Sequence, residues 1–345
     1  MSLTSLFGVE LPIIQAPMAG VQLHALALAV SNAGGLGSLP CAMLDTGAFG
    51  RELAALASGT RHPFNLNFFV HVPPVPDAAR EAAWRAALAP YYAELGIDVH
   101  AIPAGPGRLP FTKEAADALD AIRPAVVSFH FGLPDPGLVA RIKSWGSKVI
   151  SSATTVGEAR WLERHGVDAV IAQGVEAGGH RGMFLTDDLT TQVGTLALVP
   201  QIVRAVRVPV IAAGGIADAK GVAAAMALGA AGAQVGTAYL LCPEATTTPI
   251  HRAALAGEHA GHTALTNLFT GRPARGIVNR LMRELGPMSG VPPAFPLATS
   301  AIAPLRAQSE ARGSGDFSPL WSGQNASGCR AEPAARLTRA LAGVG

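Results

Sequence analysis

Short apolar runs alternate with helix-like stretches through residues 13–236, and this alternation limits the fold more than any other feature of the sequence. Each run is four or five residues long, as is typical of parallel strands that are buried on both faces. Most stretches between them are amphipathic and rich in alanine, which predicts helices over residues 23–32, 155–165, 196–206 and 218–228. The eight runs that we predict to be strands are Ile13–Pro17, Gly35–Ser38, Phe64–Asn67, Ala125–Ser128, Lys148–Ser151, Ala169–Ala172, Pro209–Ala212 and Ala233–Gly236.

Strands that alternate with helices form either an open doubly wound sheet or a closed barrel. Eight units favour the α/β fold called the (β/α)8 TIM barrel. An open dinucleotide-binding sheet would need a G-x-G-x-x-G turn after its first strand, and residues 16–20 (APMAG) lack that spacing. We therefore expect a barrel over residues 1–245 with an insertion at about 70–119. We expect residues 246–345 to form a mostly helical C-terminal extension that packs on the barrel mouth.

The composition excludes several partners. Charged residues make up 14% of the chain and hydrophobic residues 49%, so much of it must lie in a large core. The net charge is +2 and no lysine or arginine run occurs, so we expect no nucleic acid or membrane partner. No apolar stretch approaches the roughly 20 residues of a membrane span, and the N-terminus lacks a signal-peptide pattern. The three scattered cysteines indicate neither disulfides nor a metal site, so we expect a cytoplasmic protein.

Glycine-bearing loops follow the last two predicted strands, where TIM barrels usually bind phosphate. Ala213, Gly214 and Gly215 follow the seventh strand, and Gly236 and Thr237 follow the eighth. Glycines let backbone N–H groups approach phosphate oxygens, and the threonine hydroxyl adds another donor. The same glycines would also suit plain turns, but two such loops in consecutive units favour a phosphate site. In a barrel with so few charges, this predicts a bound nucleotide such as FMN.

Other strand ends support a flavin. The segment Ala16, Pro17 and Met18 follows the first strand and offers backbone amides and a thioether to a ring system. Asn67 and Gln173 end the third and sixth strands, and their amides could bind the pyrimidine edge of a flavin. Each amide alone would more often be a satisfied core polar group. Their shared position at strand ends favours the cofactor interpretation.

Two histidines follow strands on the same face of the predicted barrel. His180 lies among glycines in AQGVEAGGHRG (residues 172–182), and His130 lies in VVSFHFGLP. An isolated histidine is more often structural, but an imidazole near its ordinary pKa is well suited to accept a proton. We expect His180 to be the catalytic base and to contact the substrate. We expect His130 to bind the substrate or an anion.

Several sequence blocks together resemble the nitronate monooxygenases, formerly called 2-nitropropane dioxygenases. The blocks are LPIIQAPMAG, SNAGGLGSL, FNLNFF, VVSFHFGLP, AQGVEAGGHRG, PVIAAGGIAD, GAQVGTAYL, TGRPARGIVNRL and DFSPLWSGQNA, and they look like the class I branch. The resemblance covers nearly the whole chain. It implies a (β/α)8 barrel with non-covalent FMN. It also implies oxidation of alkyl nitronates, such as propionate 3-nitronate, by O2 to carbonyl compounds and nitrite.

The resemblance also implies roles for individual residues. His180 matches the catalytic base of the family, and Gly178 and Gln324 are softer matches to flavin-binding positions. Leu23 and His24 depart from the polar–proline pair of many relatives, which leaves the start of the first helix in question. The expected partners are a small nitronate and O2, and the expected assembly is a monomer or homodimer.

Two other functions stay open at this point. Related FMN barrels include NAD(P)H:quinone reductases and enoyl-ACP reductases, which consume reduced nicotinamide. A protein of another class would bind FMN without turnover. The pair His130 and His180 argues against mere binding, because such a protein has no reason to place two histidines at one mouth.

Overall fold

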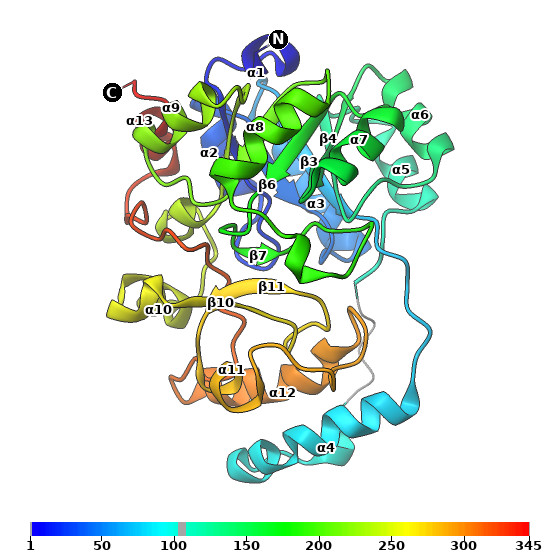
Figure 1. The fold of residues 1–345 in the computed structure, drawn as a ribbon, viewed down its shortest axis with the longest axis vertical. Coiled ribbons are helices and arrows are strands. Elements are labelled where there is room, and N and C mark those ends of the chain that lie inside the picture. Colours follow the sequence, from blue (N-terminus) through cyan, green and yellow to red (C-terminus); the bar gives the residue numbers. More distant parts are fainter. Residues whose placement is uncertain (1, 103–107, 345) are drawn as a thin grey trace.

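The computed structural model, which describes residues 2–102 and 108–344, contains a helix-covered barrel and a smaller lobe beside one end of it (Figure 1). The barrel strands are β1 (Ile13–Gln15), β2 (Gly37–Pro40), β3 (Phe64–Phe69), β4 (Val126–His130), β5 (Lys148–Ala153), β6 (Ala169–Gln173), β8 (Val210–Ala213) and β9 (Gly232–Val235). They are parallel and lie in the order β1-β9-β8-β6-β5-β4-β3-β2.

The barrel closes between β1 and β2. A parallel bridge joins Ile14 and Leu36. The N–H of Leu36 donates to the Ile13 carbonyl at 2.9 Å, and the N–H of Gln15 donates to the Leu36 carbonyl at 3.0 Å. Each of the eight predicted runs overlaps one observed strand. The (β/α)8 TIM barrel predicted from the sequence is therefore confirmed.

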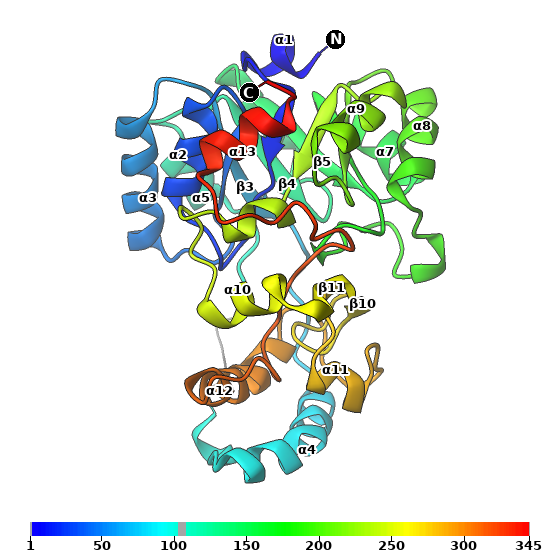
Figure 2. The same cartoon turned by 90° about the vertical axis from the view of Figure 1, so that its left-hand side faces the viewer.

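Helices cover the outside of the barrel, and α1 lies at the end away from the lobe (Figure 2). The outer helices are α2 (His24–Asn32), α3 (Thr46–Gly59), α5 (Lys113–Leu119), α6 (Pro136–Ser144), α7 (Val156–Arg164), α8 (Thr195–Ala205) and α9 (Ala219–Ala227), and the helix at the end is α1 (Leu3–Phe7). Side-chain caps start most of them; the Asp218 carboxylate, for example, accepts the Gly221 N–H at 2.8 Å at the start of α9. At α2, Leu23 provides no side-chain cap, and Glu52 of α3 accepts the His24 N–H at 2.7 Å instead.

Alternate residues of the strands belong to two separate apolar clusters. Val127, Val149 and Val170 pack with the surrounding helices. Their neighbours Val126, Ile150 and Ile171 pack inside the barrel, in a cluster that includes Leu3 and Phe7 of α1. Because both faces of each strand are buried, the strands read as continuous apolar runs rather than as alternating ones.

The smaller lobe is built from two distant parts of the chain. Helix α4 (Ala78–Leu95), in the predicted insertion, packs against α12 (Ala298–Ala311) of the C-terminal extension (Figure 1). The Tyr92 hydroxyl donates to the Ala301 carbonyl at 2.7 Å, and the Trp84 indole N–H donates to the Ala298 carbonyl at 3.4 Å. The remaining helices of the extension are α10 (Pro249–Ala256), α11 (Arg280–Leu285) and α13 (Ala334–Leu341). Short 3-10 helices are η1 (Val99–Ala101), η2 (Leu189–Thr191), η3 (Thr237–Leu241) and η4 (Glu258–Gly261).

The C-terminal extension differs from the expectation of a mostly helical cap in two ways. Strands β10 (Thr263–Thr266) and β11 (Ala274–Ile277) form an antiparallel sheet with β7 (Gly179–His180) of the barrel loop. Helix α13 packs on α2 and α9, outside the barrel, rather than at its mouth. Its Leu337 and Leu341 are buried there, because the apolar face of a short helix needs a surface to cover it.

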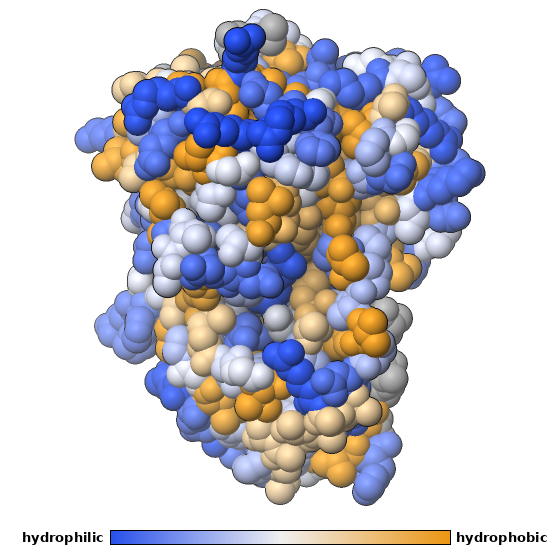
Figure 3. Space-filling view, turned by 45° about the vertical axis from the view of Figure 1, so that its right-hand side comes forward, coloured by the Kyte–Doolittle hydropathy of each residue, from blue (hydrophilic) through white to orange (hydrophobic). Residues whose placement is uncertain are grey.

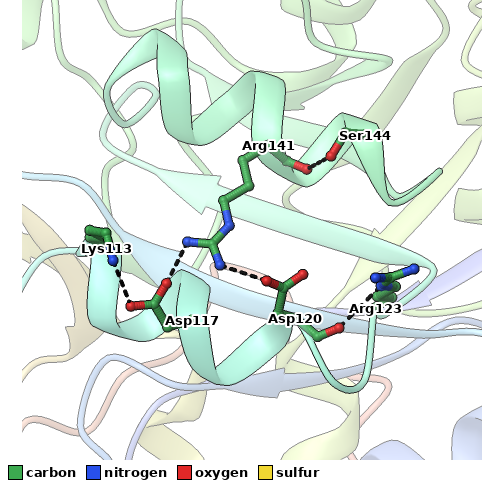
Figure 4. A network of polar contacts seen from close by, with 6 residues as sticks. All are labelled: Lys113, Asp117, Asp120, Arg123, Arg141 and Ser144. Carbon is green, nitrogen blue, oxygen red and sulfur yellow. Dashed lines mark hydrogen bonds and ion pairs between the residues drawn. The ribbon is translucent and has the colours of Figure 1, made fainter.

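Arg141 of α6 forms ion pairs with two carboxylates of the α5 region (Figure 4). Its guanidinium lies 2.6 Å from Asp117 and 2.7 Å from Asp120, and Lys113 pairs with Asp117 at 2.9 Å. These contacts link neighbouring helices on the surface of the barrel. Surface pairs of this kind add little stability singly and more as a network.

On the face shown in Figure 3, hydrophilic and hydrophobic residues are mixed over both the barrel and the narrower lobe. Within residues 2–102 and 108–344, no helix combines the length and the apolar character that crossing a membrane would require.

Candidate functional site

A cavity lies at the carboxyl ends of the barrel strands, between the barrel and the smaller lobe. The lobe contributes His251 and Trp321 to its wall, and Arg108 comes from the insertion. The cavity brings together nearly every residue predicted for the site: Ala16, Pro17, Met18, Asn67, His130, Gln173, Gly178, His180, Ala213, Gly214, Gly215, Gly236 and Thr237.

Gln324 is the predicted site residue that does not line the cavity; it is exposed. Its neighbours Gly323 and Asn325 line the cavity instead. The Gln324 N–H donates to the Glu176 carbonyl at 2.9 Å, so its backbone ties the C-terminal segment to the loop after β6. The family resemblance pointed to this segment, but a resemblance in sequence does not tell which residue of it faces the cavity.

The loops after β6, β8 and β9 and the segment 322–325 pack closely around the cavity. A Cβ atom on Gly178 would lie 2.5 Å from the Gly323 nitrogen, so glycine is required for this close approach. The Gly323 N–H donates to Thr237 Oγ1 at 2.9 Å, and Asn325 Nδ2 donates to the Gly215 carbonyl at 2.9 Å. Gly214 has a φ of 119°, a conformation that side chains rarely adopt.

Glu176 connects the loop after β6 to the start of α8. Its carboxylate accepts the Thr195 N–H at 2.8 Å and the Thr195 hydroxyl at 2.9 Å. Thr195 Oγ1 also lies 3.0 Å from the Gly214 carbonyl. The carboxylate therefore caps α8 and supports the glycine loop after β8, which is a structural role.

His180 occupies strand β7, where it pairs with Ala274 of β11. Its Nε2 lies 2.9 Å from Thr270 Oγ1. Among the described residues, Nδ1 has no hydrogen-bond partner. If Nε2 carries the proton and donates it to Thr270, Nδ1 carries the lone pair and is available as a base.

His130 and Gln173 fix the backbone of His180. The His180 carbonyl lies 3.1 Å from His130 Nε2 and accepts from Gln173 Nε2 at 3.0 Å. His130 Nδ1 lies 3.1 Å from Ser152 Oγ, so both of its ring nitrogens have protein partners. A hydrogen bond from His130 to a substrate would require one of these contacts to break.

Burial lowers the pKa of both histidines. The pKa of His180 lies well below its usual 6.5, first because of burial and then because of the charge of Arg108. Burial lowers the pKa of His130 to about 4. Both imidazoles are therefore neutral at neutral pH, the state in which His180 can accept a proton.

Arg181 is fully buried behind the cavity and does not line it. Its Nη1 donates to the Gly174 carbonyl at 2.7 Å and its Nη2 to the Gln173 carbonyl at 2.7 Å. Its Nε donates to Gln192 Oε1 at 2.9 Å. The guanidinium thus binds the chain at the end of β6, rather than a ligand.

Several cavity groups were not found by reasoning from the sequence. Phe69 and Gln234 lie on barrel strands, and Trp321, Arg108 and His251 come from outside the barrel. The sequence held one signal for this region, the TGRPARG block that contains Thr270, but its arginines favoured surface ion pairs and helix capping over ligand binding. Strand-end position cannot identify residues that reach the cavity from another part of the chain.

Two amide oxygens of the cavity have no protein partner among the described residues. Gln234 Oε1 is buried without a hydrogen bond, and Asn67 uses only its Nδ2, which donates to Ser128 Oγ at 2.9 Å. The unpaired buried oxygen of Gln234 is costly and calls for a donor from a ligand. Within the described residues, no group of three or more His, Cys, Asp or Glu side chains could hold a metal ion.

The chain is similar over nearly its full length to proteins of one family. The family model described as nitronate monooxygenase matches residues 1–342. The chain is 44% identical to a nitronate monooxygenase of Pseudomonas aeruginosa, covering 98% of this chain and 97% of that one. It is 43% identical to a nitronate monooxygenase of Paraburkholderia phytofirmans, covering 99% and 93%.

Solved structures show the same similarity. The structure of a nitroalkane oxidase from Streptomyces ansochromogenes matches with a TM-score of 0.90 and 39% identity, covering 99% of this chain and 97% of that one. FabK from Thermotoga maritima matches with a TM-score of 0.70 and 26% identity, covering 99% and 94%.

Proposed function

Because the chain belongs to the nitronate monooxygenase family, we propose that it uses FMN to oxidise alkyl nitronates with O2 to carbonyl compounds and nitrite. Family membership makes it an oxidoreductase that acts on nitronates. Propionate 3-nitronate is the substrate we propose to test first.

One observation carries the proposal: a neutral imidazole, His180, lies on a cavity whose described lining contains no acidic side chain. The charged or titratable lining groups are Arg108 and the histidines His130, His180 and His251. Such a cavity attracts an anionic substrate and does not repel it. A nitronate is an anion, so the electrostatics support this substrate class.

The residues present fit FMN. The glycine loops at Gly214–Gly215 and Gly236–Thr237 would hold its phosphate through backbone N–H groups and the threonine hydroxyl. One of the free oxygens of Asn67 and Gln234 would accept from the single N–H of its oxidised ring system. Bound FMN would supply the electron acceptor of the oxidation.

His180 would act only on substrates that still carry the proton to be removed. A neutral nitroalkane has to lose a proton from carbon before it can be oxidised, and Nδ1 of His180 would accept that proton. The hydrogen bond between Nε2 and Thr270 would hold the ring as the proton arrives. A nitronate has already lost this proton, so with it His180 would mainly orient the substrate.

The visible spectrum of the purified protein tests the cofactor, and oxygen consumption tests the reaction. We expect flavin bands near roughly 370 and 450 nm, as for a bound flavin cofactor. We expect O2 uptake and nitrite release with propionate 3-nitronate and without NADH. A colourless protein that cannot be loaded with FMN would contradict the proposal, as would a flavin-loaded protein that consumes no O2.

Anaerobic mixing with NADH distinguishes the proposed monooxygenase from a reductase of the same fold. A reductase of the same fold would bleach its flavin rapidly, whereas the proposed monooxygenase would keep its colour. A protein that only binds FMN would show neither bleaching nor nitrite release.

A further inference from the structure

One cation of the cavity, Arg108, has no role in the proposed proton transfer. Its side chain lines the cavity and is mostly enclosed by protein atoms. Burial lowers its pKa to about 10, so the guanidinium stays protonated at neutral pH. Its Cζ lies 5.5 Å from the centre of the Phe295 ring.

Arg108 has no carboxylate partner among residues 2–102 and 108–344. Within the described ranges its Nη1 is buried without a hydrogen bond, and the hydrogen-bonding contact of Nη2 is with Met43 Sδ, at 4.0 Å. A thioether is a weak acceptor. The residues outside the described ranges are Met1, 103–107 and Gly345, none of which has an acidic side chain. A buried charge without a partner is costly, so this cation is set up for an anion that the protein does not provide.

Arg108 and His180 lie close to each other in the cavity. Both side chains line the same cavity. The Phe295 ring lies beside both, with its centre 5.3 Å from the centre of the His180 ring. The Arg108 charge is also the largest electrostatic influence on the pKa of His180. The cation is therefore near the reacting end of the cavity.

The phosphate of the proposed FMN has a separate site. Its glycine loops pack against Glu176, Thr195 and Asn325, whereas Arg108 packs against Phe295 and Met43. A guanidinium presents two parallel donors that match the two oxygens of a carboxylate. The nitronate group of the proposed substrate lies beside His180, so the anion left for Arg108 is a carboxylate at the other end of the same substrate.

We propose that Arg108 is a specificity-determining residue that binds a terminal carboxylate of the substrate while the nitronate group lies beside His180. This inference rests on the proposed function. It makes the use of propionate 3-nitronate in preference to an alkyl nitronate of the same length depend on this one side chain.

Two substrates of equal length test the preference. Propionate 3-nitronate and propyl-1-nitronate differ only in a carboxylate that replaces a methyl group. We expect the Arg108→Met substitution to lower kcat/KM for propionate 3-nitronate by about 10- to 150-fold, the range for hydrogen bonds to charged groups, mainly through KM. With propyl-1-nitronate we expect a smaller loss, of about fivefold or less, because only the general attraction between the cation and the nitronate is lost and no paired hydrogen bond. Arg108→Lys should keep part of the preference, since it keeps the charge but not the paired donors.

A binding experiment gives a readout without turnover. Succinate has the chain length of propionate 3-nitronate and butyrate that of propyl-1-nitronate, and both are inert. By isothermal titration calorimetry on the flavin-loaded protein, we expect succinate to bind more tightly than butyrate to the parent protein and about equally in Arg108→Met. This comparison stands even if the parent protein oxidises no nitronate, so a failure of the proposed function can be told apart from a failure of this inference.

Arg160→Met is the matched control, because Arg160 is exposed on α7, does not line the cavity and carries the same charge. It should leave both comparisons unchanged. Equal losses on both substrates in Arg108→Met would overturn the proposal, and so would no loss on either. Loss of flavin from Arg108→Met and Arg108→Lys alike would also overturn it, because Arg108 would then serve the cofactor.

Discussion

The Nε2 atom of His180 lies 2.9 Å from Thr270 Oγ1, although 90 residues separate the two in the chain. Thr270 is buried and follows β10, while His180 pairs with β11, so the antiparallel sheet of the smaller lobe brings them together. The hydroxyl therefore orients the proposed base from outside the barrel. A partner on one ring nitrogen determines which nitrogen is free to accept a proton.

Replacing Thr270 by valine should weaken the use of neutral nitroalkanes. The substitution keeps the shape but removes the partner of Nε2, so the imidazole loses its preferred tautomer. We expect kcat/KM for nitroethane to fall by about 10- to 100-fold, the range found when a hydrogen-bond partner that orients a metal-binding histidine is removed. Steady-state kinetics should show a much smaller loss with ethyl nitronate. Thr270→Ser keeps the hydroxyl and should restore activity; failure of serine to do so would argue for a packing role only.

Replacing His180 by asparagine should lower the activity on nitroethane much more than the activity on ethyl nitronate. Proton removal by a positioned base contributes about 10²- to 10⁴-fold, so we expect a loss of that size with nitroethane. With ethyl nitronate the proton is already absent, and we expect a loss of about tenfold or less. Stopped-flow mixing with each substrate measures the two losses. Equal losses would show that His180 is not a base.

The value of kcat/KM for nitroalkanes should decline only below pH 6.5. Burial lowers the pKa of His180 below its usual 6.5, so the neutral ring persists as the pH falls toward that value. The base is lost only when the pH falls through this lowered pKa. A profile of kcat/KM for nitroethane should therefore be level around pH 6.5 and decline at lower pH. A midpoint at or above 6.5 would contradict the enclosed position of the ring.

Adding a methyl group at Gly178 should disturb the cofactor loops. The new Cβ atom would lie 2.5 Å from the Gly323 nitrogen and 2.6 Å from the Ser322 carbonyl carbon, which are backbone atoms that cannot rotate away. We expect Gly178→Ala to lower stability by roughly 1–3 kcal/mol, as overpacking does. We also expect weaker FMN retention, measured by fluorescence of released flavin.

Gly50→Ala is the control for this methyl group. Gly50 lies inside α3, and a Cβ atom there meets nothing within 4 Å. Alanine should stabilise this helix by about 0.5–1 kcal/mol without changing flavin binding. A Gly178→Ala protein with parental stability and flavin content would disprove the close packing of the two segments.

The ion pairs of Arg141 should stabilise the protein only above acidic pH (Figure 4). Hydrogen bonds from Lys113 and then Arg141 lower the pKa of Asp117, and Arg141 lowers that of Asp120. A lowered pKa stabilises the fold above the ordinary Asp value and less as the pH falls through the folded value. Arg141→Met should thus unfold at slightly lower urea than the parent at pH 7. At about pH 3, below the ordinary Asp pKa of roughly 3.9, the difference in stability between the variant and the parent should shrink. An equal difference at pH 7 and at about pH 3 would contradict the role of the ion pairs.

The sequence alone determined the barrel and the strand-end part of the cavity. A strand buried on both faces must be apolar along its length, so runs such as residues 169–172 reveal it directly. The carboxyl ends of parallel strands share one edge, so the strand pattern places Asn67, Gln173 and the glycine loops together at that edge. This inference needs only local pattern and chain order.

Only the tertiary structure decided which distant residues complete the cavity. Arg108, Thr270 and Trp321 reach it from the insertion and the C-terminal extension, whose helices α4 and α12 pack together. In the same structure the Arg181 side chain is buried and donates to the Gly174 carbonyl, and Gln324 is exposed. Packing between segments far apart in the chain decides where such side chains point, and no local pattern records which surfaces will meet.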